Sequence, residues 1–179
     1  MKKKMTKTKQ INPQSFKKLW KNKKATENIE PILLDIVKEY WVKVHKPQWN
    51  VTRKDLADRV FSEYDRLFYS DDKWYCNCVT CWTKLFWREI QAWHYRTRSC
   101  LKYRFDIKQV YPQCYTCNVV KNGYYRNYKI AMDKLVWPEM EDVYWNDNEL
   151  VEYNQSWYEE HIIERYNFIQ NKKRLIWDE

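Results

Sequence analysis

Two Cys-x-x-Cys pairs constrain the fold of this chain more than any other feature of its sequence. Cys78 and Cys81 form the first pair, and Cys114 and Cys117 form the second after 32 intervening residues. A two-residue spacing lets both thiolates of a pair reach one ion from a tight turn, and four thiolates at about 2.3 Å complete a tetrahedral zinc site. We therefore expect a closed structural zinc site, with two disulfides or unrelated buried thiols as the alternatives.

The distance between the two pairs indicates what the metal site encloses. It exceeds the roughly 15–20 residues of a simple zinc ribbon, and it leaves room for a β-hairpin between the two cysteine knuckles. Segments 87–94 and 103–107 have strand-like composition. The first of these predicted strands carries His94, the one histidine between the pairs.

Helical spacing of apolar residues predicts that the rest of the chain is mainly helical. The fold class is therefore α+β, with a zinc-stabilised module inside a helical shell. The predicted helices start at Glu30 and end before Pro47, run from Thr52 to about Tyr69, start at Asn118 and end before Pro138, and run from Glu149 to Ile176. The predicted regions are a basic flexible arm at 1–24, N-terminal helices at 25–72, the zinc module at 73–135 and a C-terminal helical extension at 136–179.

The net charge of +9 is concentrated in two places. Residues 1–24 carry ten lysines and no acid, and residues 82–134 carry eleven basic against three acidic side chains. Lysine and arginine gathered in this way neutralise phosphates and release counterions, which is typical of nucleic-acid binding. A solvated basic surface is the alternative interpretation.

The cysteine content and the hydropathy indicate the compartment. Six cysteines in 179 residues are too few for a small disulfide scaffold, and no apolar stretch is long enough to span a membrane or to form a signal peptide. We therefore expect a cytoplasmic protein with no membrane partner, because a reducing compartment favours zinc over disulfides. Cys76 and Cys100 remain as thiols outside the predicted site.

The order of these features resembles a known nuclease module. A cysteine knuckle, a hairpin bearing a histidine, and a second knuckle opening a helix resemble the treble-clef ββα-metal unit of HNH endonucleases. More narrowly, residues 56–135 resemble the NinG (Rap) family of phage recombination endonucleases. The matching segments are FSEYDRL, YCNCVTC, WREIQAWHY and YRFDIKQVYPQCYTCN.

The resemblance implies catalytic roles for three residues. In the HNH pattern the hairpin histidine, here His94, is a general base that activates water. The middle position of the pattern lies five residues before the third zinc cysteine and holds Gln109, where the family has asparagine. The last position follows the final zinc cysteine, and Asn118 occupies it.

The resemblance also implies a catalytic divalent cation, Mg²⁺, beside the structural Zn²⁺. Many HNH enzymes carry an aspartate directly before the base, but Trp93 stands there. The candidate ligands are therefore Asp106 and Asn118, with Glu89 behind them. A cation so placed would stabilise charge on the scissile phosphate and the leaving oxygen. The candidate phosphate contacts are Arg96, Arg98, Arg104 and Lys108.

The function implied is a metal-dependent, structure-selective DNA endonuclease. It would act on branched recombination intermediates such as D-loops and Holliday junctions in a bacterial or phage-infected cell, and a homodimer would suit symmetric cleavage. One alternative is a non-catalytic zinc DNA-binding accessory protein. Another is a structural zinc protein that binds protein partners through its acidic C-terminal half.

The glycine and tryptophan contents are unusual. The chain has one glycine, Gly123, and eleven tryptophans, whereas average glycine usage of about 7% would give roughly a dozen. Trp82 and Trp93 stand where the resembling family usually has glycine, and Trp74 and Trp137 stand where a turn glycine would be natural. We hypothesise that UGA codons encode glycine in the source lineage and were translated here as tryptophan. An aromatic-rich chain with strained knuckles is the alternative.

Overall fold

A computed structural model of the chain describes residues 31–41, 52–135 and 149–177. The basic arm at 1–24 and Trp137 therefore lie outside the described residues. The chain divides into two compact units at Thr52. The first contributes one described helix, α2 (Pro31–Trp41), which confirms a helix in the predicted place. An ion pair spans one turn of α2, where Lys38 Nζ lies 2.7 Å from Asp35 Oδ1.

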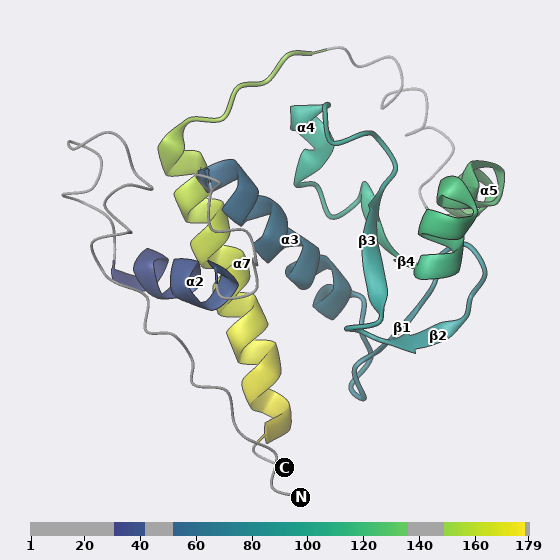
Figure 1. Ribbon diagram of the computed structural model, residues 1–179, viewed down its shortest axis with the longest axis horizontal. Helices are drawn as coiled ribbons and strands as arrows, with labels where there is room; N and C mark the ends of the chain where they lie inside the picture. The colour runs from purple at the N-terminus through teal and green to yellow at the C-terminus, as the bar shows by residue number, and fades with distance from the viewer. Residues whose placement is uncertain (1–30, 42–51, 136–148, 178–179) are drawn as a thin grey trace, which may run out of the picture. The chain divides into compact units, whose positions relative to one another are not determined.

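Two packed helices form one side of the second unit. α3 (Arg53–Phe68) lies between α7 (Gln155–Trp177) and a β-hairpin (Figure 1). α3 forms where the sequence predicts it, because its apolar side chains recur at helical spacing and bury one face. α7 begins six residues later than predicted, since Asn154 Oδ1 accepts the Trp157 N–H at 2.8 Å and caps the helix there.

Two antiparallel hairpins lie beside α3. β1 (Tyr75–Asn77) pairs with β2 (Lys84–Phe86), and β3 (Ile90–His94) pairs with β4 (Val110–Cys114). The register of the second hairpin places Ile90 opposite Cys114 and His94 opposite Val110. The hairpin that the spacing predicted between the knuckles is thus present, and His94 ends its first strand.

The predicted strand at 103–107 is wrong. This segment holds α4 (Leu101–Arg104) and a turn, and the second strand starts only at Val110. The helical turn lets Phe105 enter an aromatic cluster on α3 and α7, where its ring centroid lies 5.8 Å from Phe61 and 5.7 Å from Trp157. Tertiary packing has therefore overridden a local strand preference.

The helix predicted from Asn118 is interrupted. It begins as the π-helix η2 (Thr116–Val120), kinks through η3 (Asn122–Tyr124) and continues as α5 (Tyr125–Leu135). Gly123 makes the kink, with φ at +81°. A Cβ there would lie 2.5 Å from Trp93 Cζ2, so the position has room for glycine alone. α5 covers a core cluster that also receives Trp93 and Tyr111; its buried members are Val79, Tyr95, Tyr128, Ala131 and Met132.

Two tryptophans adopt a backbone conformation that favours glycine. Trp74 has φ at +66° and Trp82 has φ at +61°. A left-handed conformation costs a residue with a Cβ about 1–2 kcal/mol. Trp93 lies within strand β3 and does not have a positive φ, and its ring fills the space beside Gly123, so the backbone shows no demand for glycine at position 93. The backbone thus agrees with the glycine hypothesis at Trp74 and Trp82.

We predict that Trp82→Gly raises the unfolding free energy by about 1 kcal/mol, because it removes the left-handed strain and the side chain is 60% exposed. Trp87→Gly is the matched control. It should destabilise the protein by about 3–5 kcal/mol, since that side chain is buried. Denaturant unfolding of the zinc-loaded proteins measures both. The codons give a second check, because UGG at all four suspect positions would refute the recoding hypothesis.

Asp65 on α3 is an uncompensated buried acid. It is fully buried, and neither carboxylate oxygen has a hydrogen-bond partner among the described residues. Burial raises its pKa well above the ordinary value, against a smaller opposing effect of Arg66. The unfolded chain releases this proton above about pH 4 while the folded chain keeps it, so stability falls as pH rises, by up to about 1.4 kcal/mol per pH unit.

Asp65→Asn should remove this pH dependence. The variant should match the parent near pH 4, and its unfolding free energy should exceed that of the parent by a growing margin up to the folded-state pKa of Asp65. Comparing the two proteins at each pH cancels the contributions of zinc and histidine, which they share. Asp72→Asn, at an exposed position, should track the parent throughout. Parallel curves for Asp65→Asn and the parent would contradict the prediction.

Candidate metal centre and histidine site

The four cysteines of the two pairs gather into one cluster. The sulfurs of Cys78, Cys81, Cys114 and Cys117 all lie within 4.8 Å of one another. Cys81 Sγ and Cys114 Sγ are 3.7 Å apart, and four sulfurs about 2.3 Å from a central ion would be separated by about 3.8 Å. All six cysteines are free thiols. The donor set and its spacing therefore fit a structural zinc ion, and the disulfide alternative does not fit this arrangement.

Backbone hydrogen bonds hold the knuckles. Cys78 N donates to Thr83 O at 2.9 Å and Trp82 N donates to Cys78 O at 2.8 Å, which closes the first turn directly after β1. Val79 N donates to Pro112 O at 2.9 Å and joins this turn to β4. Cys114 ends β4 and Cys117 lies in η2, so the second pair is positioned by the strand and the π-helix.

The electrostatics of the cluster favour a bound cation. Burial raises the pKa of Cys78 and of Cys117. Burial also acts on Cys81, but hydrogen bonds from the Thr83 side chain and backbone prevail and lower its pKa to about 6. Buried thiols of raised pKa ionise readily only beside a positive charge, which a coordinated metal supplies. Cys76 lies apart from the cluster, where its buried Sγ contacts Arg66 O at 3.0 Å.

His94 is held by both ring nitrogens. Nε2 lies 3.1 Å from the carbonyl oxygen of Arg104. A carbonyl can only accept, so Nε2 carries the proton and Nδ1 is left as the acceptor. Arg98 Nε donates to Nδ1 across 3.5 Å. The imidazole therefore presents an unprotonated nitrogen on the side of an exposed arginine.

The surroundings of His94 keep its ring neutral. Burial, and then the positive charge of Arg98, lower the pKa of His94 to about 4, against a smaller opposing effect of the Arg104 carbonyl. At neutral pH the ring can accept a proton at Nδ1. This is the state that a general base requires before reaction.

The four candidate phosphate contacts have different surroundings. Arg98 and Lys108 are exposed, and Arg96 is half-buried against the Tyr103 ring. Arg104 is committed to Asp58, with Nε donating to Oδ1 at 2.7 Å and Nη2 to Oδ2 at 2.5 Å. Of the four side chains, that of Arg98 contacts the imidazole, through its Nε and the Nδ1 atom of His94.

Gln109 and Asn118 do not contact His94. Gln109 is fully buried and its side-chain amide has no partner among the described residues, although its carbonyl accepts the Tyr95 N–H at 2.8 Å. Asn118 Nδ2 donates to Gln91 Oε1. Gln91 lies three residues before His94 on β3, which is about 10 Å along the strand and on the opposite face.

Asp106 and Glu89 do not complete a second metal site. Asp106 Oδ1 accepts the Lys108 N–H at 2.9 Å and so stabilises the turn before β4. Glu89 is exposed in the turn before β3. Among the described residues, the four cysteines form the sole group of three or more His, Cys, Asp or Glu side chains close enough to hold an ion. The cation roles of Asp106 and Asn118 therefore stay predictions.

Asp58 is a residue that sequence reasoning missed. It lies on α3, 46 residues from its partner Arg104. An acidic residue on the polar side of an amphipathic helix gives no local signal of such a contact. The structure alone brings it to the histidine site.

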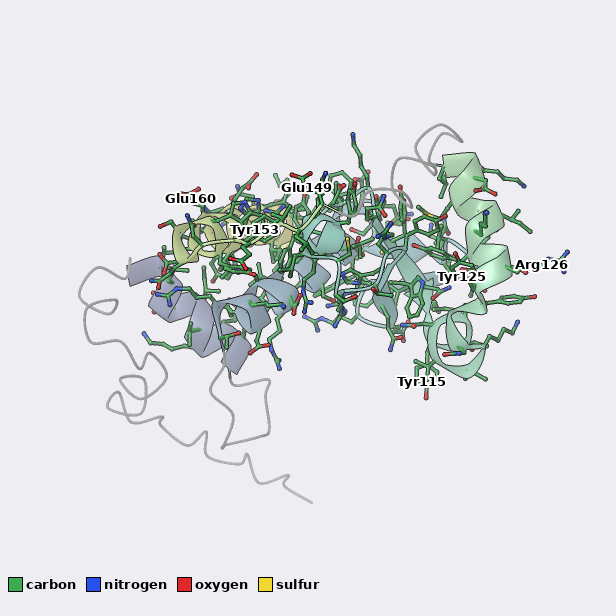
Figure 2. The ribbon with its side chains drawn as sticks, turned by 90° about the horizontal axis from the view of Figure 1, so that it is seen from above. Tyr115, Tyr125, Arg126, Glu149, Tyr153 and Glu160 are labelled. Atoms are coloured by element: carbon green, nitrogen blue, oxygen red, sulfur yellow. The ribbon has the colours of Figure 1, made fainter. Side chains whose placement is uncertain are left out.

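The exposed side chains of the second unit differ in type from one region to another. Figure 2 shows Tyr115, Tyr125 and Arg126 projecting from the η2–α5 region, whereas Glu160 lies on α7. Exposed side chains around η2 and α5 are a mixture of apolar and basic types, among them Val119, Val120, Lys121, Arg126 and Lys134. No helix in the described part of the chain is long and apolar enough to cross a membrane.

Comparison with protein-family models, with curated proteins and with solved structures finds no match to this chain. What is shown of the second unit is therefore its structure. It is a mixed α+β unit, mostly helical, with two small hairpins around a four-cysteine cluster suited to zinc.

We predict about one tightly bound zinc ion per chain. Cys114→Ser should lose most of the zinc and lower the melting temperature, because metal-binding free energy is folding free energy in small metal modules. Cys76→Ser removes a buried thiol outside the cluster and should keep the zinc. Elemental analysis after gel filtration measures both. Full zinc content in Cys114→Ser would refute the ligand assignment.

Proposed function

We propose that the chain is a metal-dependent DNA endonuclease that hydrolyses phosphodiester bonds in branched recombination intermediates, with His94 as the general base. The observation that carries this proposal is the orientation of the imidazole. Its Nε2–H is tied to the Arg104 carbonyl, and its Nδ1 is free of a proton and faces an exposed arginine. His161 also lies against a backbone carbonyl, that of Trp157 at 3.0 Å, so the feature particular to His94 is the unprotonated nitrogen beside an exposed arginine.

The element order supports the same proposal. A cysteine knuckle at the β1–β2 hairpin, the β3–β4 hairpin, a second knuckle from the end of β4 into η2, and the following α5 succeed one another as in a treble-clef ββα-metal unit. Zinc, when bound by the four cysteines, would hold the two knuckles together. That role is structural, because four protein ligands leave no open coordination position.

The proposed chemistry belongs to His94 and Arg98. A DNA phosphate that pairs with Arg98 would neutralise the nearest charge that lowers the pKa of His94, and would leave Nδ1 open to water. Nδ1 then takes a proton from a water molecule as the water oxygen attacks phosphorus. The phosphorus–oxygen bond to the leaving group breaks, and the departing oxygen takes a proton from solvent. Arg98 both recruits the phosphate and, by leaving Nδ1, prepares the base.

The described residues do not gather a cation site at His94. The requirement for a divalent cation therefore comes from the family resemblance, and it is tested by comparing Mg²⁺ with a chelator. Asp106 and Asn118 remain the proposed ligands. Neither side chain contacts His94: Asp106 accepts the Lys108 N–H, and Asn118 lies toward the other end of β3 through its bond to Gln91.

A second function is favoured because the described residues hold no second metal site. A zinc-dependent DNA-binding accessory protein would need the cysteine cluster and the basic surface but no second metal site. Such a protein would bind branched DNA, with affinity falling steeply as salt rises, and would not cut it. A parent protein that binds but never cleaves with Mg²⁺ or Mn²⁺, even when glycine replaces Trp93, would favour this function.

We predict that His94→Ala retains zinc and DNA affinity but loses cleavage of branched DNA by about 10²–10⁴-fold, the usual contribution of a general base. His161→Ala is the control, because that imidazole stacks on Trp157 in α7 at 3.6 Å and lies outside the site. For the parent, kcat/KM should decline only as pH falls toward about 4, where His94 becomes protonated. Parental cleavage by His94→Ala would refute the assignment.

A further inference from the structure

Arg104 contacts the histidine site through its backbone and through its side chain. Its carbonyl accepts the Nε2–H of His94 at 3.1 Å. Its guanidinium donates through Nη1 to the carbonyl of Arg98, the residue whose side chain faces Nδ1. Arg104 therefore holds the Nε2 side of the imidazole with its carbonyl, and holds the backbone of Arg98, on the Nδ1 side, with its guanidinium.

Asp58 holds Arg104 from outside the zinc module. The carboxylate accepts two parallel hydrogen bonds from the guanidinium, and the two side chains are only 17% and 12% exposed. Bidentate arginine–carboxylate pairs combine strength with fixed geometry. The pair also raises the pKa of Arg104, chiefly through the hydrogen bonds that its guanidinium donates to Asp58, so the guanidinium stays charged and in place.

We propose that Asp58 and the Arg104 side chain are positioning residues that fix the tautomer and orientation of His94. This inference rests on the proposed function for its catalytic consequence, but its structural part can be tested without cleavage. Asp58 touches no reacting atom. It acts on Arg104, whose carbonyl selects the Nε2–H tautomer and leaves Nδ1 as the proton acceptor.

The physical consequence of losing Asp58 follows from these contacts. A partly buried guanidinium without its carboxylate would turn toward water, and the segment from Arg98 to Arg104 would lose its anchor. The Arg104 carbonyl would then no longer hold Nε2–H, and the imidazole would populate both tautomers. The charged groups that face His94 are Arg98, Arg104 and Asp58, and the Tyr158 hydroxyl of α7 lies near the ion pair.

Asp58→Asn tests the proposal in the zinc-loaded full chain. Nitrogen-detected NMR of His94 should show one Nε2–H tautomer in the parent and a mixture in the variant. The kcat for branched DNA should fall by about 10–100-fold with KM nearly unchanged, which is the usual range when a supporting hydrogen bond is lost. The acidic limb of the pH profile should move as well, because the Asp58 charge acts on the imidazole.

The matched control is Glu159→Gln. Glu159 pairs with Arg53 of α3, and the two side chains are 22% and 15% exposed, similar to the Asp58 pair. Breaking this pair should lower stability to a similar extent, yet leave the His94 tautomer, kcat and the pH profile unchanged. Asp58→Glu keeps the carboxylate and should restore part of the kcat. If Asp58→Asn folds poorly, Arg104→Lys keeps the carbonyl and loses the bidentate contact, and should give the same readouts.

The tautomer and the kcat together separate the positioning role of Asp58 from the proposed nuclease function. If Asp58→Asn and Arg104→Lys leave the tautomer and the kcat at parental values and change only stability, the positioning role is refuted. If the tautomer changes as expected but the parent never cleaves DNA, the positioning role stands and the proposed nuclease function fails. If both the tautomer and kcat change while the Glu159→Gln control stays parental, both proposals are supported.

Discussion

The register of the β3–β4 ladder is the constraint on which the rest of the second unit depends. It places Ile90 opposite Cys114 at one end and His94 opposite Val110 at the other. The metal cluster and the histidine site are thus the two ends of one five-residue pairing. A slip of one residue would turn every side chain of the strand to the opposite face, and would separate His94 from the Arg104 carbonyl and Ile90 from its partner Cys114. Zinc binding would oppose such a slip, because it ties the knuckles to the ladder.

The helices α3 and α7 stabilise the connection between the two strands. Phe105 inserts among aromatic rings of both helices, Tyr69 donates its hydroxyl to Ile107 O at 2.8 Å, and Asp58 holds Arg104. Each of these contacts joins residues far apart in the sequence. A connection of this length would otherwise be among the most mobile parts of a small domain, and a histidine that depended on its carbonyls would share that mobility. The helical shell therefore has a role at the site beyond covering the core.

The features that the sequence predicted well are those that depend on local patterns. Cysteine spacing predicted the cluster, helical periodicity predicted α3, and strand composition placed His94 on a hairpin. The failed prediction at 103–107 and the missed residue Asp58 share one cause. Both depend on the contact between α4 and α3, which brings together residues 46 positions apart, and neither periodicity nor propensity carries that information. The bond between Asn118 and Gln91 was missed for the same reason.

Trp93 bears on both the glycine hypothesis and the proposed nuclease function. Neighbouring residues on a strand face opposite ways, so the Trp93 side chain points toward Gly123 and Tyr128, away from His94. Asn118 lies on the Trp93 side of the strand through its bond to Gln91. The indole therefore occupies space beside the residue predicted to hold a cation, rather than space in front of Nδ1. Glycine at this position would leave the base unchanged and open the face of β3 on which a cation bound by Asn118 would have to sit.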